Sequence, residues 1–161
     1  MTRTEFGVER SVCACGNCQI NCRFMPGMLI PADLPRLIPA GVDPFAWADA
    51  NLLASPGALV TRNGEVFRVP TLVPAVKADG SCIHLGEGGR CGVHQDAPFG
   101  CAFFSCGPEI PGMSARGITA IYRDPPEGLY KRLWARLSYA GKAQERAEVL
   151  RGRMRRYMGL E

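Results

Sequence analysis

The clearest pattern of apolar and polar positions lies in the segment ALVTRNGEVFRVPTLVPA, where two apolar runs flank an Asn-Gly dipeptide. This dipeptide is favoured in the two-residue type I′ turn, because both of its residues tolerate a positive φ. The pattern predicts a β-hairpin with strands at about Ala58–Arg62 and Glu65–Val69. Proline has no N–H to donate to a sheet, so Pro70 and Pro74 are expected to end the hairpin.

Two helices are predicted before this hairpin. The segment DPFAWADANLLA begins with Asp43 as a helix cap and with Pro44 at the first helical position, where proline is well tolerated. Leu52 and Leu53 are expected among the apolar contacts of this helix. A shorter helix is expected near residues 32–38, within a segment that several prolines interrupt.

The C-terminal part of the chain is predicted to be helical and basic, over about residues 127–158. Its apolar residues recur at the i, i+3, i+4 and i+7 spacing of one helix face. These residues are Tyr130, Leu133, Trp134 and Leu137. A second stretch, from Lys142 to Tyr157, follows Gly141 and has an apolar stripe of its own. We interpret both stripes as packing faces.

Length and composition indicate a globular protein of one domain, covering residues 1–161. The 13 prolines and 19 glycines indicate a high loop content. No run of about 18 apolar residues occurs, so no membrane span is expected. The first residues, MTRTEFGVERS, lack the apolar core of a signal peptide, so the expected location is the cytoplasm.

The net charge of +4 is unevenly distributed along the chain. The segment from Lys131 to Arg156 has nine basic and two acidic residues, which gives it +7 and leaves −3 for the rest. A solvated helix face is the simpler interpretation, and docking of an acidic protein partner is the functional one. Nucleic acid is an unlikely partner, because few aromatic residues that could stack on bases accompany the charge.

Eight cysteines are the most informative residues in the sequence. They form two groups, Cys13, Cys15, Cys18 and Cys22, then Cys82, Cys91, Cys101 and Cys106. The first group is expected in an irregular loop, and the second in a glycine-rich loop region with at most short strands. In a reducing cytosol, clustered cysteines bind metal or do redox chemistry more often than they form disulfides. Thiolates prefer zinc, copper(I) and iron–sulfur clusters. A structural zinc ion and a [4Fe–4S] cluster each take four such ligands, so eight thiols suffice for two sites.

The spacing of the cysteines leaves the metal and the exact ligand set open. Cys22 and Cys106 each lie at the outer end of a group and are the expected spares. His94 follows Cys91 at the spacing of a mixed zinc knuckle, so it is a candidate ligand or a hydrogen-bond partner of one. His84 lies between apolar residues and is expected to be packed. No catalytic triad or phosphate loop can be argued from the sequence, so an enzyme is the less favoured class.

The segment DGSCIHLGEGGRCGVHQDAPFGCAFFSC resembles the signature half of the YkgJ-type cysteine-cluster family, a zinc- or iron-chelating domain. The matching residues are Gly80, Cys82, Leu85, Arg90, Cys91, His94, Pro98, Cys101 and Phe104. CACGNC resembles the N-terminal cysteine run of that family, so the resemblance covers about residues 13–106. The adjacent Cys-Cys pair of the family is absent here, and Ala97-Pro98 stands where the family has Arg-Pro. The family includes a flagellin lysine methylase with an iron–sulfur cluster, which favours iron but does not imply methylation by this shorter chain.

These patterns predict a small, loop-rich α+β domain with one β-hairpin and C-terminal helices, organised by metal through a core at about residues 13–106. We expect one or two [4Fe–4S] clusters, a protein partner, and a role in electron transfer or as an accessory subunit of a redox assembly. One alternative is a structural zinc module that docks a protein or RNA partner through its basic helix. A further alternative is a cluster-dependent enzyme.

Overall fold

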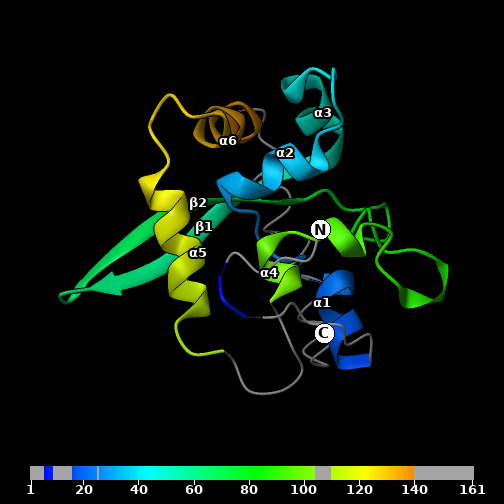
Figure 1. The fold of residues 1–161 in the computed structure, drawn as a ribbon, viewed down its shortest axis with the longest axis horizontal. Helices are drawn as coiled ribbons and strands as arrows, with labels where there is room; N and C mark the ends of the chain where they lie inside the picture. Colours follow the sequence, from blue (N-terminus) through cyan, green and yellow to red (C-terminus); the bar gives the residue numbers. More distant parts are fainter. Residues whose placement is uncertain (1–5, 9–15, 25, 104–109, 140–161) are drawn as a thin grey trace.

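The fold combines helices with one antiparallel hairpin in a single small domain, as the sequence predicts (Figure 1). The computed structural model describes residues 6–8, 16–24, 26–103 and 110–139. The helices are α1 (Gly16–Phe24), α2 (Leu34–Leu37), α3 (Pro44–Asn51), α4 (Phe99–Ala102), α5 (Met113–Arg123) and α6 (Leu129–Tyr139). Three short 3₁₀ turns accompany them, η1 (Pro31–Asp33), η2 (Glu87–Gly89) and η3 (His94–Asp96). The strands are β1 (Leu52–Arg62) and β2 (Glu65–Pro74).

The hairpin is longer than the sequence predicts, although its turn is at the expected place. Asn63 and Gly64 have φ values of 53° and 81°, so both have the positive φ that a type I′ turn requires. The pairing runs from Arg62 opposite Glu65 back to Leu52 opposite Pro74. Our expectation that Pro70 ends the hairpin is therefore wrong, because β2 continues through Pro70 to Pro74.

An irregularity in β1 explains why a proline is tolerated within β2. The register shifts between Ser55 and Ala58, which pair with Thr71 and Val69. Pro70 lies between these two partners, opposite the shift, where the regular ladder of hydrogen bonds is already interrupted. A residue without an N–H therefore costs little at this position.

Helix α3 begins as predicted and ends earlier. The Asp43 carboxylate accepts hydrogen bonds from the backbone N–H groups of Phe45 and Ala46, and Pro44 occupies the first helical position. Leu52 and Leu53 belong to β1, so our assignment of them to the helix is wrong. The short helix expected near residues 32–38 is confirmed as η1 followed by α2.

Helix α6 uses its predicted apolar stripe to pack on the hairpin. Tyr130, Leu133 and Leu137 are buried, and the indole N–H of Trp134 donates to the Ser55 carbonyl at 3.1 Å. The bond to Ser55 falls at the irregularity of β1. The second predicted stretch, residues 142–157, lies outside the described residues.

Tyr130 also joins three segments through its hydroxyl group. The hydroxyl donates to the Leu29 carbonyl at 2.7 Å and accepts from the Leu72 N–H at 2.8 Å. The Leu29 N–H donates in turn to the Leu72 carbonyl at 2.8 Å. A fully buried polar group thus has partners on both sides, as burial requires.

Helix α5 was not predicted from the sequence. Its residues Met113, Gly117 and Ile121 are buried and recur every four positions, which is the signal that could have identified it. Together with the hairpin, α2, α3 and α6, it forms what we call the body. The cysteine region consists of α1, residues 75–98 and α4, which lie below α2 and α3 in the view of Figure 1. Within the described residues, no helix is long and apolar enough to cross a membrane.

Candidate metal site

The first cysteine group continues into a helix rather than an irregular loop. Cys18 and Cys22 both lie in α1, so our expectation of a loop is wrong for these two residues. Their spacing of four residues places them on the same side of the helix. Cys13 and Cys15 lie outside the described residues, as does Cys106.

The second cysteine group begins in a loop that is held by isolated backbone pairs, as the glycine-rich sequence predicts. Val76 pairs with Cys82 and Leu85 pairs with Cys91, each as a single antiparallel bridge. The Leu85 N–H also donates to the Cys82 carbonyl at 3.0 Å, which closes a turn between the two bridges. The Lys77 ammonium group donates to the Leu85 carbonyl across this loop. Cys82 and Cys91 are thereby connected through one residue, Leu85.

Helix α1 packs against this loop. The Cys82 N–H donates to the Cys22 carbonyl at 2.7 Å, so the backbones of the two cysteines are in direct contact. One turn earlier on the helix, the Gln19 side chain lies where a side chain on Gly89 would be. The two cysteine groups, 60 residues apart in the sequence, therefore meet in space.

Cys101 lies at a close crossing of two backbone segments, Gly27–Met28 and Gly100–Cys101. The Gly100 N–H donates to the Met28 carbonyl at 2.8 Å, and the Gly27 N–H donates to the Cys101 Sγ at 3.2 Å. A Cβ on Gly27 would collide with the backbone of Gly100, so this crossing requires glycine. Cys101 is consequently fixed beside the segment that leaves α1.

Two of the described cysteines have raised pKa values. Burial raises the pKa of Cys101 far above its ordinary value, and Cys22, Cys82 and Cys91 raise it further, while the Gly27 N–H opposes the shift. Burial and the nearby Cys91 also raise the pKa of Cys22. A cation bound near such thiols would stabilise their deprotonated form and lower their pKa values, because its positive charge offsets the repulsion between thiolates.

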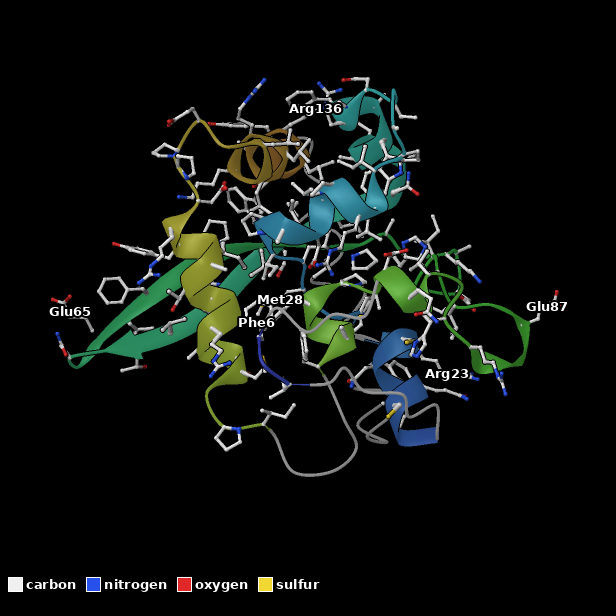
Figure 2. All side chains as sticks on the ribbon, in the orientation of Figure 1. Phe6, Arg23, Met28, Glu65, Glu87 and Arg136 are labelled. Carbon is white, nitrogen blue, oxygen red and sulfur yellow. The ribbon has the colours of Figure 1, made fainter. Side chains whose placement is uncertain are left out.

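An aromatic cluster lies at α4. Phe99 begins α4 and Phe103 follows it, with ring centroids 5.3 Å apart. Phe6, labelled in Figure 2, packs edge-on against both rings, at 5.0 and 5.4 Å. The Phe6 carbonyl accepts a hydrogen bond from Arg116 of α5. Phe6 and Cys101 both pack against the hydrophobic core that contains Phe99 and Phe103.

A buried carboxylate, missed in the sequence, holds α4 in place. Asp33 is fully buried, and its Oδ2 accepts hydrogen bonds from the N–H groups of Ile30 and Phe99 at 2.9 and 2.8 Å. It thus ties the start of the cysteine-bearing helix α4 to η1. The sequence gives no signal for this role, because a hydrogen bond that spans 66 residues leaves no local pattern.

The two histidines differ in their surroundings. His84 is half-buried, its Nε2 is buried without a hydrogen-bond partner, and burial lowers its pKa. This agrees with a packed histidine. His94 begins η3. Its backbone N–H donates to the Cys91 carbonyl at 3.3 Å, so the His94 backbone lies next to a candidate ligand.

The thiols of this region are suitable ligands for a soft metal, but their arrangement in the structure is not that of a metal site. Five cysteines are described, and in addition to burial, Cys22, Cys82 and Cys91 raise the pKa of Cys101, and Cys91 raises that of Cys22. Among the described residues, however, no three His, Cys, Asp or Glu side chains form a group that could hold a metal ion. The described cysteines therefore lie in one region of the fold, but their side chains are not arranged as the ligands of one ion.

Comparison with known protein families, with curated proteins and with solved structures finds no match to this chain. The resemblance to the cysteine-cluster family therefore rests on the quoted motifs alone.

Proposed function

We propose that this protein binds an iron–sulfur cluster of the [4Fe–4S] type through its cysteines and serves in electron transfer or as an accessory subunit of a redox assembly. The observation that carries the proposal is the meeting of two cysteine groups from distant parts of the chain. The Cys82 N–H donates to the Cys22 carbonyl at 2.7 Å, and the Gly27 N–H, five residues after Cys22, donates to the Cys101 Sγ at 3.2 Å. A [4Fe–4S] cluster takes four thiolates of this kind.

The surroundings of Cys101 support a cluster that exchanges electrons. An N–H donated to a ligand sulfur stabilises the added negative charge of a reduced cluster, and such bonds tune its reduction potential. The Gly27 N–H is in this position. Cys22 and Cys91 remain partly exposed, which leaves a path for an electron to a protein partner.

Zinc is the alternative metal, because four thiolates are also a common ligand set for structural zinc. The resemblance to a family with an iron–sulfur member favours iron. Under the zinc alternative, the region would serve as a binding module with no redox activity.

Metal analysis of the anaerobically purified protein separates these alternatives. Iron and acid-labile sulfide in equal amounts, with broad visible absorption that bleaches on reduction, are the expected result. Stoichiometric zinc without sulfide would replace the cluster with the zinc module. A colourless protein with neither metal, even after reconstitution with iron and sulfide, would refute metal binding altogether.

A further inference from the structure

We propose that the free end of the hairpin is a docking surface for an extended, acidic segment of a partner protein, which adds to the edge of β2 as a third strand. We call this end of the hairpin, residues 60–68, the arm. The inference goes beyond the proposed function. It concerns a part of the molecule outside the cysteine region and does not depend on a bound metal.

The arm is more exposed than the rest of the hairpin. The residues of β2 from Glu65 to Arg68 are all exposed, whereas the strand is mostly buried from Val69 onward. Val66 and Phe67 are 64% and 46% exposed, so two large apolar side chains next to each other face water. Figure 1 shows the turn of the hairpin extending away from the helices, and Glu65 marks this end in Figure 2. Two strands alone are only marginally stable in water, so the arm would gain stability from a third.

The outer edge of β2 is already used for hydrogen bonding inside the body. The Leu72 N–H donates to the Tyr130 hydroxyl, and the Leu72 carbonyl accepts from the Leu29 N–H, both at 2.8 Å. The backbone groups of successive residues in an antiparallel strand point to alternate edges, so Val66 faces the same edge as Leu72. Among the described residues, the sheet contains no strand beyond β2 at this edge. An extended segment can therefore pair with the arm where Leu29 and Tyr130 bond the strand further along.

The two faces of the arm indicate which side chains the segment should have. Side chains alternate between the faces of a strand, so Arg68 shares one face with Val66, and Phe67 lies on the other face. Residues that are opposite each other in neighbouring strands lie on the same face of the sheet. The added strand should therefore place acidic side chains on the face of Arg68 and apolar side chains on the face of Phe67.

The charge around the arm is complementary to an acidic segment. Arg68 is exposed, and α5, which packs against β2, also exposes Arg116 and Arg123 and contains no acidic residue. Glu65 is the acidic residue of β2. The exposed arginines outnumber this glutamate, so the surface attracts negative charge and disfavours a basic segment. Tyr122 of α5 is 72% exposed and offers a further apolar contact.

Fluorescence anisotropy with a labelled peptide tests the docking. The probe is Glu-Val-Glu-Val-Glu-Val-Glu, which as a strand has glutamates on one face and valines on the other. The full-length chain should bind it at low salt, and added salt should weaken binding because exposed charges are screened. A matched probe with N-methyl groups on all of its inner amides keeps every charge and loses the backbone donors. It should bind about tenfold more weakly, because it cannot pair with the edge of β2.

Arg68→Glu should weaken binding of the unmethylated peptide by about fivefold, since it replaces an attraction with a repulsion. Arg132→Glu is the matched control, because it makes the same change at an exposed arginine of α6 rather than of the arm. This variant should bind the peptide as the wild type does. Equal affinity for the two probes, equal loss in the two variants, or no binding of the peptide by the wild type would overturn the proposal.

Nucleic acid and anionic membrane are the other negatively charged surfaces that the arm could meet. Labelled oligothymidylate and phosphatidylserine vesicles are therefore measured beside the peptide, with the wild type and with Arg68→Glu. The expected result is weaker binding of both than of the peptide, and no effect of Arg68→Glu on what remains. Binding of either one that exceeds peptide binding and is lost in Arg68→Glu would overturn the assignment of the arm to a protein partner.

Discussion

The body and the cysteine region are held together by different means. In the body, Leu52, Leu72, Leu133 and Leu137 are at most 1% exposed, and the buried Tyr130 hydroxyl has hydrogen-bond partners on both sides. The cysteine region is held by isolated bridges, turns and a few backbone bonds, and most of its described thiols are only half-buried. Apolar burial stabilises the body throughout, whereas in the cysteine region it is concentrated at Ala97, Phe99 and Ala102, and Leu85 is the one buried Leu, Ile, Val, Met or Phe of residues 75–98. A bound metal would therefore stabilise the cysteine region more than the body.

If the protein binds metal as proposed, removal of that metal should give the largest effect, confined to the cysteine region. The binding free energy of a structural metal is on the order of 10 kcal/mol and becomes folding free energy for the residues that hold it. In hydrogen exchange, the Cys82, Ile83 and Gly92 amides should lose protection when the metal is stripped. The Leu72 amide of the body, and the Leu29 amide that donates to the Leu72 carbonyl, should keep their protection. Unchanged exchange and an unchanged melting curve in the stripped protein would show that the cysteine region is ordered without metal.

Leu133→Ala should have the largest effect on the body itself. Leu133 is a fully buried residue of α6. Its change to alanine creates a cavity and should lower the free energy of unfolding by about 2–5 kcal/mol. Val66→Ala, at a position that is 64% exposed, is the matched control and should change it by less than about 0.5 kcal/mol. Chemical denaturation measures both. Equal effects would mean that burial does not stabilise the body as described.

Tyr130→Phe tests the buried hydroxyl without creating a large cavity. It leaves the Leu72 N–H and the Leu29 carbonyl without this partner, so the free energy of unfolding should fall by about 1–3 kcal/mol. Tyr139→Phe removes the same atom from a side chain that is 92% exposed and should have almost no effect. The argument fails if the two variants are equally stable.

The same hydroxyl should make the body sensitive to alkaline pH. Burial raises the pKa of Tyr130 above its ordinary value of 10.0, so the folded chain holds this proton more tightly than the unfolded chain does. Its contribution to stability is full below about pH 10 and falls as the pH rises further. Tyr130→Phe should lack this part of the decline, and Tyr139→Phe should retain it. Parallel pH profiles for wild type and Tyr130→Phe would exclude the effect.

Arg136→Ala should give the smallest effect. Arg136 makes a bidentate ion pair with Asp49, with the closest contact at 2.5 Å, and lies over the Phe45 ring (Figure 2). Both charged side chains are exposed, so the pair is screened by salt and contributes little. The melting temperature should fall slightly, and the difference from wild type should shrink at high salt. A large, salt-independent loss would show that this contact is part of the core of the body.

Several elements of the body could be predicted because local physics determines them. The Asn63-Gly64 turn, the Asp43 cap and the apolar stripe of α6 each depend on residues that are near one another in the sequence. The extent of the hairpin could not be predicted, because the tolerance of Pro70 depends on a register shift in the opposite strand. The basic face of α6 is exposed at Arg132 and Arg136, in agreement with the solvated helix face that the sequence predicts. Its contacts could not be predicted, because Arg132 lies over Phe45 of α3 at 4.9 Å and Lys131 donates to the Asp124 carbonyl at the end of α5.

The sequence by itself determined the eight thiols and their division into two groups, since both can be counted without a structure. Only the tertiary structure decided which segments that carry them come into contact. That outcome depends on the bond between Cys82 and Cys22, on the crossing of Gly27 with Gly100, and on the reach of Asp33 to Phe99. Each of these contacts joins residues that are 60 or more positions apart. Such contacts leave no periodic or local pattern, because they are selected by the packing of whole elements rather than by neighbours along the chain.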